Sequence, residues 1–497
     1  MLFISEVETM EQVSGWQGKK VLVIGAARQG IALARYLTAQ GAEVTVNDRR
    51  NFDQLSKSRE ALQTESVRWV AGGHPLSVLD GIEMVFISGG VPCDLPLVIE
   101  ASNRGIPISN DSQLFLEICP CKVVGITGSA GKTTTTTLLG LIAEAAVDQT
   151  QSIKQEVSKS VSEIPLIDPT SKVWVGGNIG LPLISIVDQI KPDDLAIMEL
   201  SSFQLEILQN SPAVAAILNI TPNHLDRHKS MQNYISAKSR IIKFQTSQDV
   251  AVLNFDDQIV RSLRDDIHGR LISYRLHETV GEGTSIFFDP NTQSVQIYSP
   301  TQQGGERVNV IKLSEIPLRG DHNLMNVIAA CGIAKACGIS PEAMHSGIKK
   351  FTGIAHRLEF VRSWGGGDWY NDSIATAPER AIAAINAFTE PLILLAGGRD
   401  KDLPWDGFAS LVSERVQHLI VFGEAAGVIL SAISKYEEGS NTDVTYCSGL
   451  EEAVKTAAGL VTEGQVVLLS PGGTSFDEFN DFEERGEAFK KWVMELV

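Results

Sequence analysis

Short apolar runs alternate with amphipathic stretches in the first third of the chain. Residues 19–25 (KKVLVIG) form an apolar run rich in β-formers, and the helical pattern of 31–40 (IALARYLTAQ) follows and ends at Gly41. Two further apolar runs, at 43–48 and 84–90, predict strands. This alternation predicts a parallel sheet covered by helices.

The same alternation recurs twice. A second α/β unit begins at 122–127 (KVVGIT), and a third begins after about residue 354. Later apolar runs predict strands at 195–200, 213–220, 250–255, 391–398, 418–423 and 465–470. At roughly 150 residues per domain, a chain of 497 residues has room for three domains. We therefore expect an α/β protein with domains at 1–115, 116–353 and 354–497.

Two stretches break this pattern. Residues 147–171 are polar and lack strong periodicity, which predicts a loop insertion. Residues 281–307 contain GEG, DPN and QQGG between short β-like runs, which predicts turns that link an antiparallel hairpin. Neither stretch carries an obvious catalytic motif.

Composition narrows the class of protein. The chain is 43% hydrophobic and 21% charged, as globular proteins are, and its net charge of −18 disfavours binding to nucleic acid or anionic membranes. Six scattered cysteines do not form a disulfide framework, and the close pair Cys119 and Cys121 lacks partners at zinc spacing. The N-terminus is acidic, and no apolar run approaches the ~18 residues of a membrane span. We expect a soluble cytoplasmic protein.

The strongest chemical signal follows the strand at 122–127. In Gly125-Ile-Thr-Gly-Ser-Ala-Gly-Lys-Thr-Thr134, glycines allow backbone N–H groups to cradle phosphate oxygens, and the helix that follows adds a favourable dipole. Lys132 would reach the β- and γ-phosphates, and the Thr133 hydroxyl would bind Mg²⁺. Ile126 occupies a position where the general P-loop pattern has glycine, so the motif is the variant T-G-x-x-G-K-T. A plain strand–turn–helix is the alternative.

Three candidate partners of this loop, Glu199, His224 and Lys238, lie later in the sequence. Glu199 ends an apolar strand, where a buried carboxylate needs either a metal ion or an ion pair. His224 and Lys238 lie 14 residues apart, about 21 Å on one straight helix, so they converge only if the chain folds back between them. Taken singly, they also fit an ordinary loop histidine and a solvated lysine.

The first strand ends in a degenerate dinucleotide fingerprint, Gly25-Ala-Ala-Arg-Gln29-Gly30. Ala27 replaces the glycine that allows close approach to a pyrophosphate, so the motif is weak evidence for NAD. It remains compatible with a nucleotide diphosphate, with Asp48 or the neighbouring arginines at the end of the second strand. A generic βα turn is the other interpretation.

Taken together and in order, the motifs resemble those of the Mur ligase family of peptidoglycan synthesis. The matching segments span nearly the whole chain: VLVIGAARQG, ITGSAGKTT, GGNIG, ELSSFQLE, HLDRH, YISAK, NFDD, GDHNLMN, HRLE, NDSIAT, GGRDK and SPGGTSFDEF. SSFQLE, NDSIAT and the last segment look like the D-glutamate-adding members. The DNP motif usual in the diaminopimelate- or lysine-adding members is absent from the sequence.

The resemblance implies a Rossmann-like UDP-binding domain, a central P-loop ATPase domain with a mainly parallel sheet, and a Rossmann-like C-terminal domain. It implies that the UDP-sugar contacts Arg50, Ser88 and Asn178, beside the Gly25, Gln29 and Asp48 of the fingerprint. ATP would be bound by Gly128, Ser129, Gly131, Lys132, Thr133, Thr134, Asn323, Asn326, Arg357 and Asp372. Magnesium would be bound by Thr133, Glu199, His224 and a carbamylated Lys238, and D-glutamate by Thr376, Lys401, Ser475 and Phe482.

The resemblance also implies a reaction. ATP would phosphorylate the carboxylate of UDP-N-acetylmuramoyl-L-alanine, and the amine of D-glutamate would displace phosphate, with Mg²⁺ required and the C-terminal domain closing over the site. The enzyme would be a cytoplasmic monomer. Ile374 departs from relatives that have lysine there. A folylpolyglutamate synthase and a P-loop ATPase without ligase activity remain alternatives, whereas a dehydrogenase would leave the GKTT segment unexplained.

Overall fold

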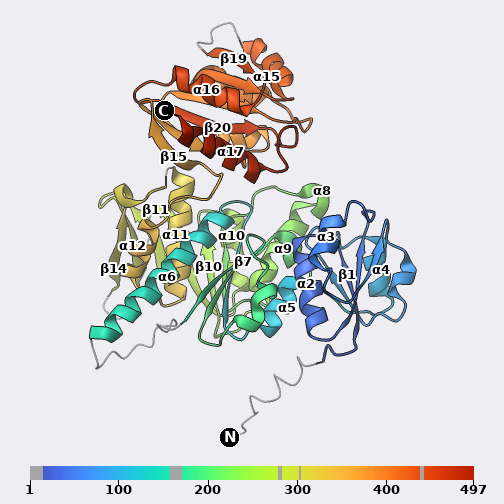
Figure 1. The fold of residues 1–497 in the computed structure, drawn as a ribbon. Helices are drawn as coiled ribbons and strands as arrows, with labels where there is room; N and C mark the ends of the chain where they lie inside the picture. The colour runs from blue at the N-terminus through green and yellow to red at the C-terminus, as the bar shows by residue number, and fades with distance from the viewer. Residues whose placement is uncertain are drawn as a thin grey trace. The chain divides into compact units, whose positions relative to one another are not determined.

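The computed structural model describes residues 15–156, 171–277, 283–301, 304–318, 320–436 and 442–496. Two compact units divide the chain. Unit 1 comprises residues 1–316 and 321–351, and unit 2 comprises residues 317–320 and 352–497. Within the described residues, unit 1 contains two sheets and unit 2 contains one (Figure 1).

The N-terminal sheet is fully parallel, in the order β3-β2-β1-β4-β5. Alternate residues of β1 face opposite ways: Val21 and Val23 pack with α2, whereas Leu22 and Ile24 pack with α4. The elements are β1 (Lys20–Ile24), α2 (Arg28–Ala39), β2 (Glu43–Asp48), α3 (Ser56–Ala61), β3 (Val67–Ala71), the 3₁₀ helix η1 (Leu76–Leu79), β4 (Met84–Ile87), α4 (Pro96–Asn103) and β5 (Ile108–Ser109).

The second sheet of unit 1 has nine strands in the order β14-β13-β12-β11-β10-β9-β6-β8-β7. It is parallel from β7 to β12, and β12, β13 and β14 are antiparallel. The strands are β6 (Lys122–Thr127), β7 (Val173–Gly177), β8 (Leu195–Glu199), β9 (Val214–Ile217), β10 (Val250–Asn254), β11 (Arg270–His277), β12 (Ser285–Asp289), β13 (Ser294–Ser299) and β14 (Glu306–Lys312). The antiparallel hairpin predicted within 281–307 is confirmed.

Helices and 3₁₀ helices cover this second sheet. They are α5 (Asp111–Ile118), α6 (Lys132–Glu156), η2 (Leu183–Gln189), α7 (Ser202–Leu205), α8 (Leu225–His228), α9 (Met231–Lys243), α10 (Gln258–Ser262), η3 (Leu263–Asp266), η4 (Leu313–Glu315), α11 (Asp321–Ala336) and α12 (Pro341–Lys349).

One prediction about unit 1 is wrong in part. Residues 147–156 do not form a loop, because α6 continues through them to Glu156. Their polar side chains bind α12 instead of facing only solvent: Gln149 Nε2 donates to Ser346 Oγ over 3.5 Å, and Lys350 Nζ donates to Asp148 Oδ2 over 3.2 Å. The rest of the predicted insertion, 157–170, lies outside the described residues.

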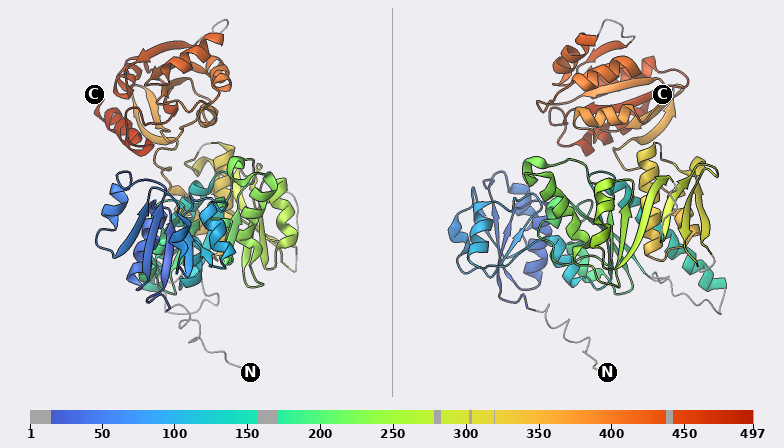
Figure 2. Two further views of the ribbon diagram at one scale, coloured as in Figure 1. Left: turned by 90° about the vertical axis from the view of Figure 1, so that its right-hand side faces the viewer. Right: turned by 180° about the vertical axis from the view of Figure 1, so that it is seen from behind.

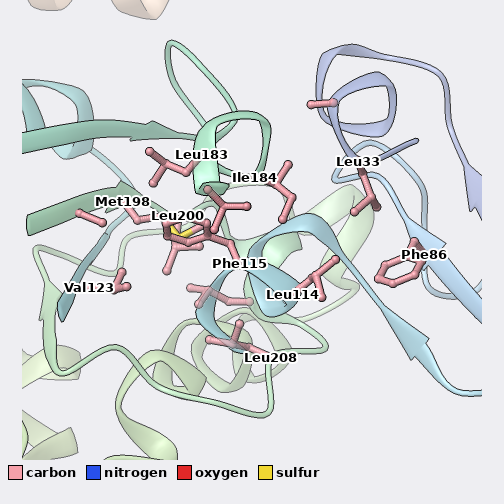
Figure 3. Packing of buried hydrophobic residues seen from close by; sticks show 14 of the residues in the cluster. Leu33, Phe86, Leu114, Phe115, Val123, Leu183, Ile184, Met198, Leu200 and Leu208 are labelled. Atoms are coloured by element: carbon pink, nitrogen blue, oxygen red, sulfur yellow. The ribbon is translucent and has the colours of Figure 1, made fainter. Parts of the chain in front are cut away.

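A single hydrophobic cluster joins the two sheets of unit 1. Leu33 of α2 and Phe86 of β4 lie in the same cluster as Leu183 of η2 and Leu200, which directly follows β8 (Figure 3). Helix α5 connects the two groups and contributes Leu114 and Phe115 (Figure 3). This shared core explains why both sheets belong to one compact unit.

Unit 2 is an α/β layer structure around a six-stranded sheet in the order β15-β16-β20-β17-β18-β19. Only β15 runs antiparallel to its neighbour. The elements are β15 (Glu359–Trp364), β16 (Gly367–Asn371), α13 (Pro378–Ile385), β17 (Leu392–Gly397), α14 (Asp406–Arg415), β18 (Val416–Phe422), α15 (Ala426–Ile433), η5 (Ser434–Tyr436), β19 (Asp443–Cys447), α16 (Leu450–Leu460), β20 (Val466–Gly472) and α17 (Phe482–Glu495).

Helices cover both faces of this sheet (Figure 2). Leu394 of β17 packs with Phe408 of α14, whereas Ile393 and Leu395 pack on the other face with Phe489 of α17. The predicted α/β class with mostly parallel sheets is therefore confirmed. No helix in the described part of the chain has the length and apolarity of a membrane span.

Candidate active site

The phosphate-loop motif lies where parallel α/β sheets place their ligands, at the carboxyl end of the interior strand β6. The loop's conformation requires glycine: Gly131 has φ 80°, and a Cβ there would lie 2.3 Å from Asn326 Oδ1. Helix α6 begins at Lys132, so its N-terminal N–H groups face the loop. Lys132 Nζ donates to the carbonyl oxygens of Gly128, over 2.8 Å, and Ser129, over 3.3 Å.

The end of the neighbouring strand β9 fixes this loop. Asn219 was not among the predicted site residues, yet its Oδ1 accepts from the Ala130 N–H over 2.8 Å, and its backbone carbonyl accepts from the Ser129 N–H over 2.9 Å. The hydroxyl of Ser129 donates to the Thr221 carbonyl and lies 2.9 Å from that of Tyr234. The position of Asn219 just after a buried strand was the available sequence signal.

Glu199 ends β8, the strand next to β6, and its side chain is buried. Its Oε2 accepts a hydrogen bond from the Thr133 hydroxyl over 2.9 Å, and its Oε1 accepts one from Asn178 Nδ2 over 2.8 Å. One carboxylate therefore connects the predicted phosphate loop to a predicted contact of the UDP-sugar.

Lys238 reaches the same loop from α9. Its side chain is 1% exposed, and its Nζ donates to the Gly128 carbonyl over 2.9 Å and to Thr127 Oγ1 over 3.3 Å. Burial lowers the pKa of Lys238 well below its usual value, the positive charge of Lys132 lowers it further, and Glu199 opposes the change. The fold thus brings Lys238 close to Lys132 and Glu199.

His224 lies on an exposed turn rather than on the helix that carries Lys238. It adopts a left-handed conformation with φ 52° immediately before the short helix α8, and α9 begins separately at Met231. Its ring meets the ring of Phe203 edge-on at 5.0 Å. The chain between His224 and Lys238 is therefore not one straight helix, as their convergence requires. That the two residues bind one metal ion together stays a prediction.

Helix α11 borders the phosphate loop through two asparagines predicted to contact ATP. Asn326 Oδ1 lies 3.5 Å from the donating hydroxyl of Thr135 in α6, and Asn326 Nδ2 donates to Asn323 Oδ1 over 3.3 Å. Asn326 therefore lies next to the first turn of α6, and the contact of both asparagines with ATP stays a prediction.

The predicted UDP-sugar residues gather at the carboxyl end of the N-terminal sheet. Gly25 has φ 95°, and a Cβ there would lie 3.0 Å from Ser88 Cβ, while a Cβ at Gly89 would lie 3.0 Å from Gln29 Oε1. Arg28 NH2 donates to the Asn178 carbonyl over 2.9 Å and so joins this edge to the second sheet. Gly25, Gln29, Ser88 and Asn178 thus lie around one region of unit 1.

Asp48 and Arg50 form an ion pair beside this region. Arg50 donates through Nε to Asp48 Oδ1 over 3.0 Å and through NH2 to Oδ2 over 2.8 Å, and the Ala26 N–H donates to Oδ2 over 2.8 Å. Burial alone would raise the pKa of Asp48, but these hydrogen bonds outweigh it and lower the pKa to about 2. Asp48 therefore holds the turn after β1 as well as the guanidinium predicted to lie near uridine.

Unit 2 carries the remaining predicted ATP contacts. Asp372 is buried, and its Oδ2 accepts from the Ser470 hydroxyl over 2.9 Å while its Oδ1 accepts from the Leu358 N–H over 3.2 Å. Burial raises the pKa of Asp372 to about 7, against the effect of Ser470, Leu358 and Arg357. Arg357 lies between two residues of positive φ, His356 and Leu358, so a strained backbone presents its side chain.

Two of the predicted D-glutamate residues meet directly. Lys401 Nζ donates to Thr376 Oγ1 over 3.3 Å. Ser475 is buried, and its carbonyl closes a turn by accepting from the Phe479 N–H over 2.8 Å. Phe482 begins α17 and its ring lies edge-on to that of His356 at 6.2 Å.

A buried arginine that sequence reasoning missed connects the segments that carry the predicted D-glutamate residues. Arg485 donates through NH2 to the carbonyls of Ser373 and Gly473, over 2.9 and 3.1 Å, and through Nε to Ser373 Oγ over 3.0 Å. Ser373 Oγ in turn donates to the Phe482 carbonyl over 2.8 Å. A lone arginine in a helix gives no sequence signal of such a role, because most arginines are surface residues.

Family models match three stretches of the chain. Residues 19–110 match the Mur ligase MurD-like N-terminal domain, residues 126–334 the Mur ligase middle domain, and residues 356–473 the Mur ligase glutamate ligase domain. Each stretch covers most of one of the three sheets.

Curated relatives match over nearly their full length. The chain is 38% identical to the UDP-N-acetylmuramoylalanine–D-glutamate ligase of Pelotomaculum thermopropionicum, covering 96% of this chain and 98% of that protein. It is 35% identical to the enzyme of the same name from Acetivibrio thermocellus, covering 96% of both chains.

Among solved structures, the fold resembles that of a UDP-N-acetylmuramate–alanine ligase from Thermotoga maritima, with a TM-score of 0.56, 16% identity, and coverage of 96% of this chain and 99% of that chain. A pseudomurein peptide ligase type C from Methanothermus fervidus gives a TM-score of 0.50 at 18% identity, covering 95% of this chain and 100% of that chain.

Proposed function

The chain belongs to the Mur ligase family, and we propose that it joins D-glutamate to UDP-N-acetylmuramoyl-L-alanine in an ATP-dependent reaction of peptidoglycan precursor synthesis. The observation that carries this proposal is the position of Glu199, whose two oxygens bind Thr133 of the phosphate loop and Asn178 of the predicted UDP-sugar site. A nucleotide at Thr133 and a UDP-sugar at Asn178 would both lie beside this carboxylate, which supports phosphoryl transfer between them. The name shared by the full-length relatives supports this choice of substrates.

Amide formation requires that the carboxylate is first activated by ATP. A carboxylate is a poor acyl donor, because its leaving group would be oxide. Transfer of the γ-phosphoryl group of ATP makes an acyl phosphate, from which phosphate leaves readily when the D-glutamate amine attacks. Amide, ADP and phosphate result. The carboxylate and the triphosphate are both anionic, so Lys132 and the N-terminal N–H groups of α6 would offset their repulsion.

The donor set fits Mg²⁺. Thr133 and Glu199 supply hard oxygen donors, and Mg²⁺ commonly takes only one or two protein carboxylates and completes its shell with phosphate oxygens and water. Within the described residues, no group of three or more His, Cys, Asp or Glu side chains could hold a metal ion. We propose that His224 and a carbamylated Lys238 contribute the other protein ligands. When bound, Mg²⁺ would stabilise the charge of the transferring phosphoryl group.

Unit 2 would supply the acceptor. Lys401 with Thr376 offers a cation and a hydroxyl for one carboxylate of D-glutamate, and Ser475 offers a contact for the other. Since water would hydrolyse an acyl phosphate, we propose that the C-terminal domain closes over the site before chemistry. We place the reaction in the cytoplasm, where ATP and nucleotide sugars are made, and expect a monomer.

Phosphate release tests this proposal directly. Purified protein with ATP and Mg²⁺ should release phosphate only when UDP-N-acetylmuramoyl-L-alanine and D-glutamate are both present. L-glutamate should be a poor substrate, because inverting the α-carbon displaces the amine or one carboxylate. A lost charged hydrogen bond, worth about 1.5–3 kcal/mol, corresponds to about 10- to 150-fold in kcat/KM. Phosphate release with a folate substrate in place of the UDP-sugar, or ATP hydrolysis independent of both substrates, would contradict the proposal.

A further inference from the structure

An arginine of helix α8 binds the loop that follows β4. Arg227 NH1 donates to the Gly89 carbonyl over 3.2 Å, and its NH2 donates to the Val91 carbonyl over 2.6 Å. The guanidinium lies 4.0 Å from the ring centroid of Phe203, and the side chain is only 16% exposed. A planar fork of donors suits two neighbouring carbonyls in a way that an ammonium group does not.

Glu206 holds the same loop, residues 88–93, and His228 in turn contacts Glu206. Glu206 accepts a hydrogen bond from the Cys93 thiol over 3.1 Å, and its other oxygen lies 3.0 Å from Nδ1 of His228. The His228 ring stacks on Phe203 at 5.3 Å and is buried. Residues of the second sheet's α7–α8 region therefore hold a loop of the N-terminal sheet at three points, Gly89, Val91 and Cys93.

This loop includes Ser88, the predicted contact of the UDP-sugar. Its sequence, Ser88-Gly-Gly-Val91, has two glycines, which allow many backbone conformations. Within the loop, the Val91 N–H donates a hydrogen bond to the Ser88 carbonyl over 2.8 Å. The Gly89 carbonyl and the Gly90 N–H belong to one planar trans peptide and point in opposite directions. Because Arg227 binds the carbonyl, the Gly90 N–H points away from the guanidinium.

We infer that Arg227 is a positioning residue for the UDP-sugar substrate: its guanidinium holds the carbonyls of Gly89 and Val91, and thereby fixes the backbone that carries Ser88. This inference rests on the proposed function. Loss of Arg227 should therefore weaken binding of the UDP-sugar without weakening binding of ATP, whose phosphate loop is held by Asn219.

The chain offers a matched control. Arg240 of α9 borders the same open cavity, of about 380 Å³, as Arg227 does. Its Nε also donates to a backbone carbonyl, that of Leu208, over 2.8 Å, and its guanidinium lies 5.3 Å from the ring of Phe244. Within the described part of the chain, the guanidinium of Arg240 donates to the Leu208 carbonyl and to none of residues 88–93, so Arg240→Lys tests for the general effect of replacing a carbonyl-binding arginine.

The experiment measures KM for UDP-N-acetylmuramoyl-L-alanine, KM for ATP and kcat in the full-length wild type, Arg227→Lys and Arg240→Lys. We expect Arg227→Lys to raise KM for the UDP-sugar about 10-fold or more, because a charged hydrogen bond is lost, and to change KM for ATP less than twofold. Arg240→Lys should leave both values near those of the wild type.

Chemical rescue separates positioning from a fold defect. In Arg227→Ala, millimolar guanidinium can enter the open cavity beside residue 227 and should lower KM for the UDP-sugar, whereas it should not do so in Arg240→Ala. The inference is overturned if Arg227→Lys matches Arg240→Lys, if KM for ATP rises as much as KM for the UDP-sugar, or if guanidinium has no effect on Arg227→Ala. Absence of turnover by the wild type would instead overturn the proposed function, and the inference with it.

Discussion

Two positively charged side chains meet at the phosphate loop. Lys132 and Lys238 both donate to the Gly128 carbonyl, so two ammonium groups converge on one oxygen. The sequence indicated each lysine separately, but it could not show that Lys238 is buried, because a lysine in an amphipathic helix is normally solvated. Its burial changes the chemistry expected of it, since a buried amine favours its neutral form.

Lys238 should be carbamylated. A protonated amine has no lone pair for a cation, whereas a neutral amine adds CO₂ to give a carbamate, an anionic oxygen ligand. Lys238→Ala should lose nearly all activity and regain part of it with acetate, which can replace the carbamate. Lys243 is an exposed lysine of the same helix, so Lys243→Ala should keep its activity, and acetate should not change that activity. Rescue of Lys238→Ala by alkylamines instead of carboxylates would mean that the cationic lysine is the working form.

Asp372 should make stability depend on pH in unit 2. Burial raises its pKa from 3.8 to about 7 in the folded protein, so the unfolded chain releases the proton at lower pH than the folded chain does. Stability should therefore fall as pH rises from about 4 to about 7, and the loss should be complete above pH 7. This fall of stability with rising pH is opposite to the effect of an ion-paired carboxylate, which adds stability as pH rises.

The test is Asp372→Asn, which keeps the shape and removes the charge. We expect its Tm to exceed that of the wild type by at least about 2 °C at pH 8, because a ΔΔG of 1 kcal/mol corresponds to about 2–4 °C in a domain of this size. The difference should shrink towards pH 5. Asp443→Asn, in exposed β19, is the control. A Tm difference that does not change between pH 5 and pH 8 would show that the Asp372 carboxyl is not responsible.

At the scale of elements, strands were predicted better than helix ends. The strand at 122–127 matches β6 in both bounds, because a run of apolar β-formers between polar residues is unambiguous. The continuation of α6 to Glu156 was missed, because its polar face is stabilised by α12, which lies about 200 residues away in sequence. The phosphate loop was predicted from its motif, but its support by Asn219 depends on the neighbouring strand order.

The turn from β6 into α6 should tolerate no side chain at Gly131. An alanine there would have φ near 80°, a left-handed conformation that costs about 1–2 kcal/mol, and its Cβ would press on Asn326. We expect Gly131→Ala to raise KM for ATP at least about 5-fold, because the loop must shift to relieve this contact. Gly427→Ala is the matched control, since a Cβ on that residue of α15 meets no atom within 4 Å. Equal KM values for ATP in the two variants would contradict the assigned role of the loop.

At the scale of the whole molecule, the predicted chemistry is divided between the two units. Residues predicted to activate the carboxylate, Lys132 and Glu199, belong to unit 1, whereas Lys401 and Thr376, predicted to bind the acceptor, belong to unit 2. The alternating apolar runs predicted three α/β units, and the family resemblance implied this division of the residues between them. They could not predict that the first two sheets share one hydrophobic core, since that depends on which faces of α5 and η2 meet.

This division predicts that the two half-reactions can be separated. Lys401→Ala should raise KM for D-glutamate about 10- to 150-fold, because one charged hydrogen bond to a carboxylate is lost. It should still form the acyl phosphate, which transfer of ¹⁸O from the labelled carboxylate of the UDP-sugar into phosphate detects. Lys132→Ala should lose both the isotope transfer and amide formation, whereas Lys122→Ala, an exposed lysine at the start of β6, should keep both. If Lys401→Ala also abolished the isotope transfer, Lys401 would act in activation, and the assignment of the acceptor site to Lys401 and Thr376 would be wrong.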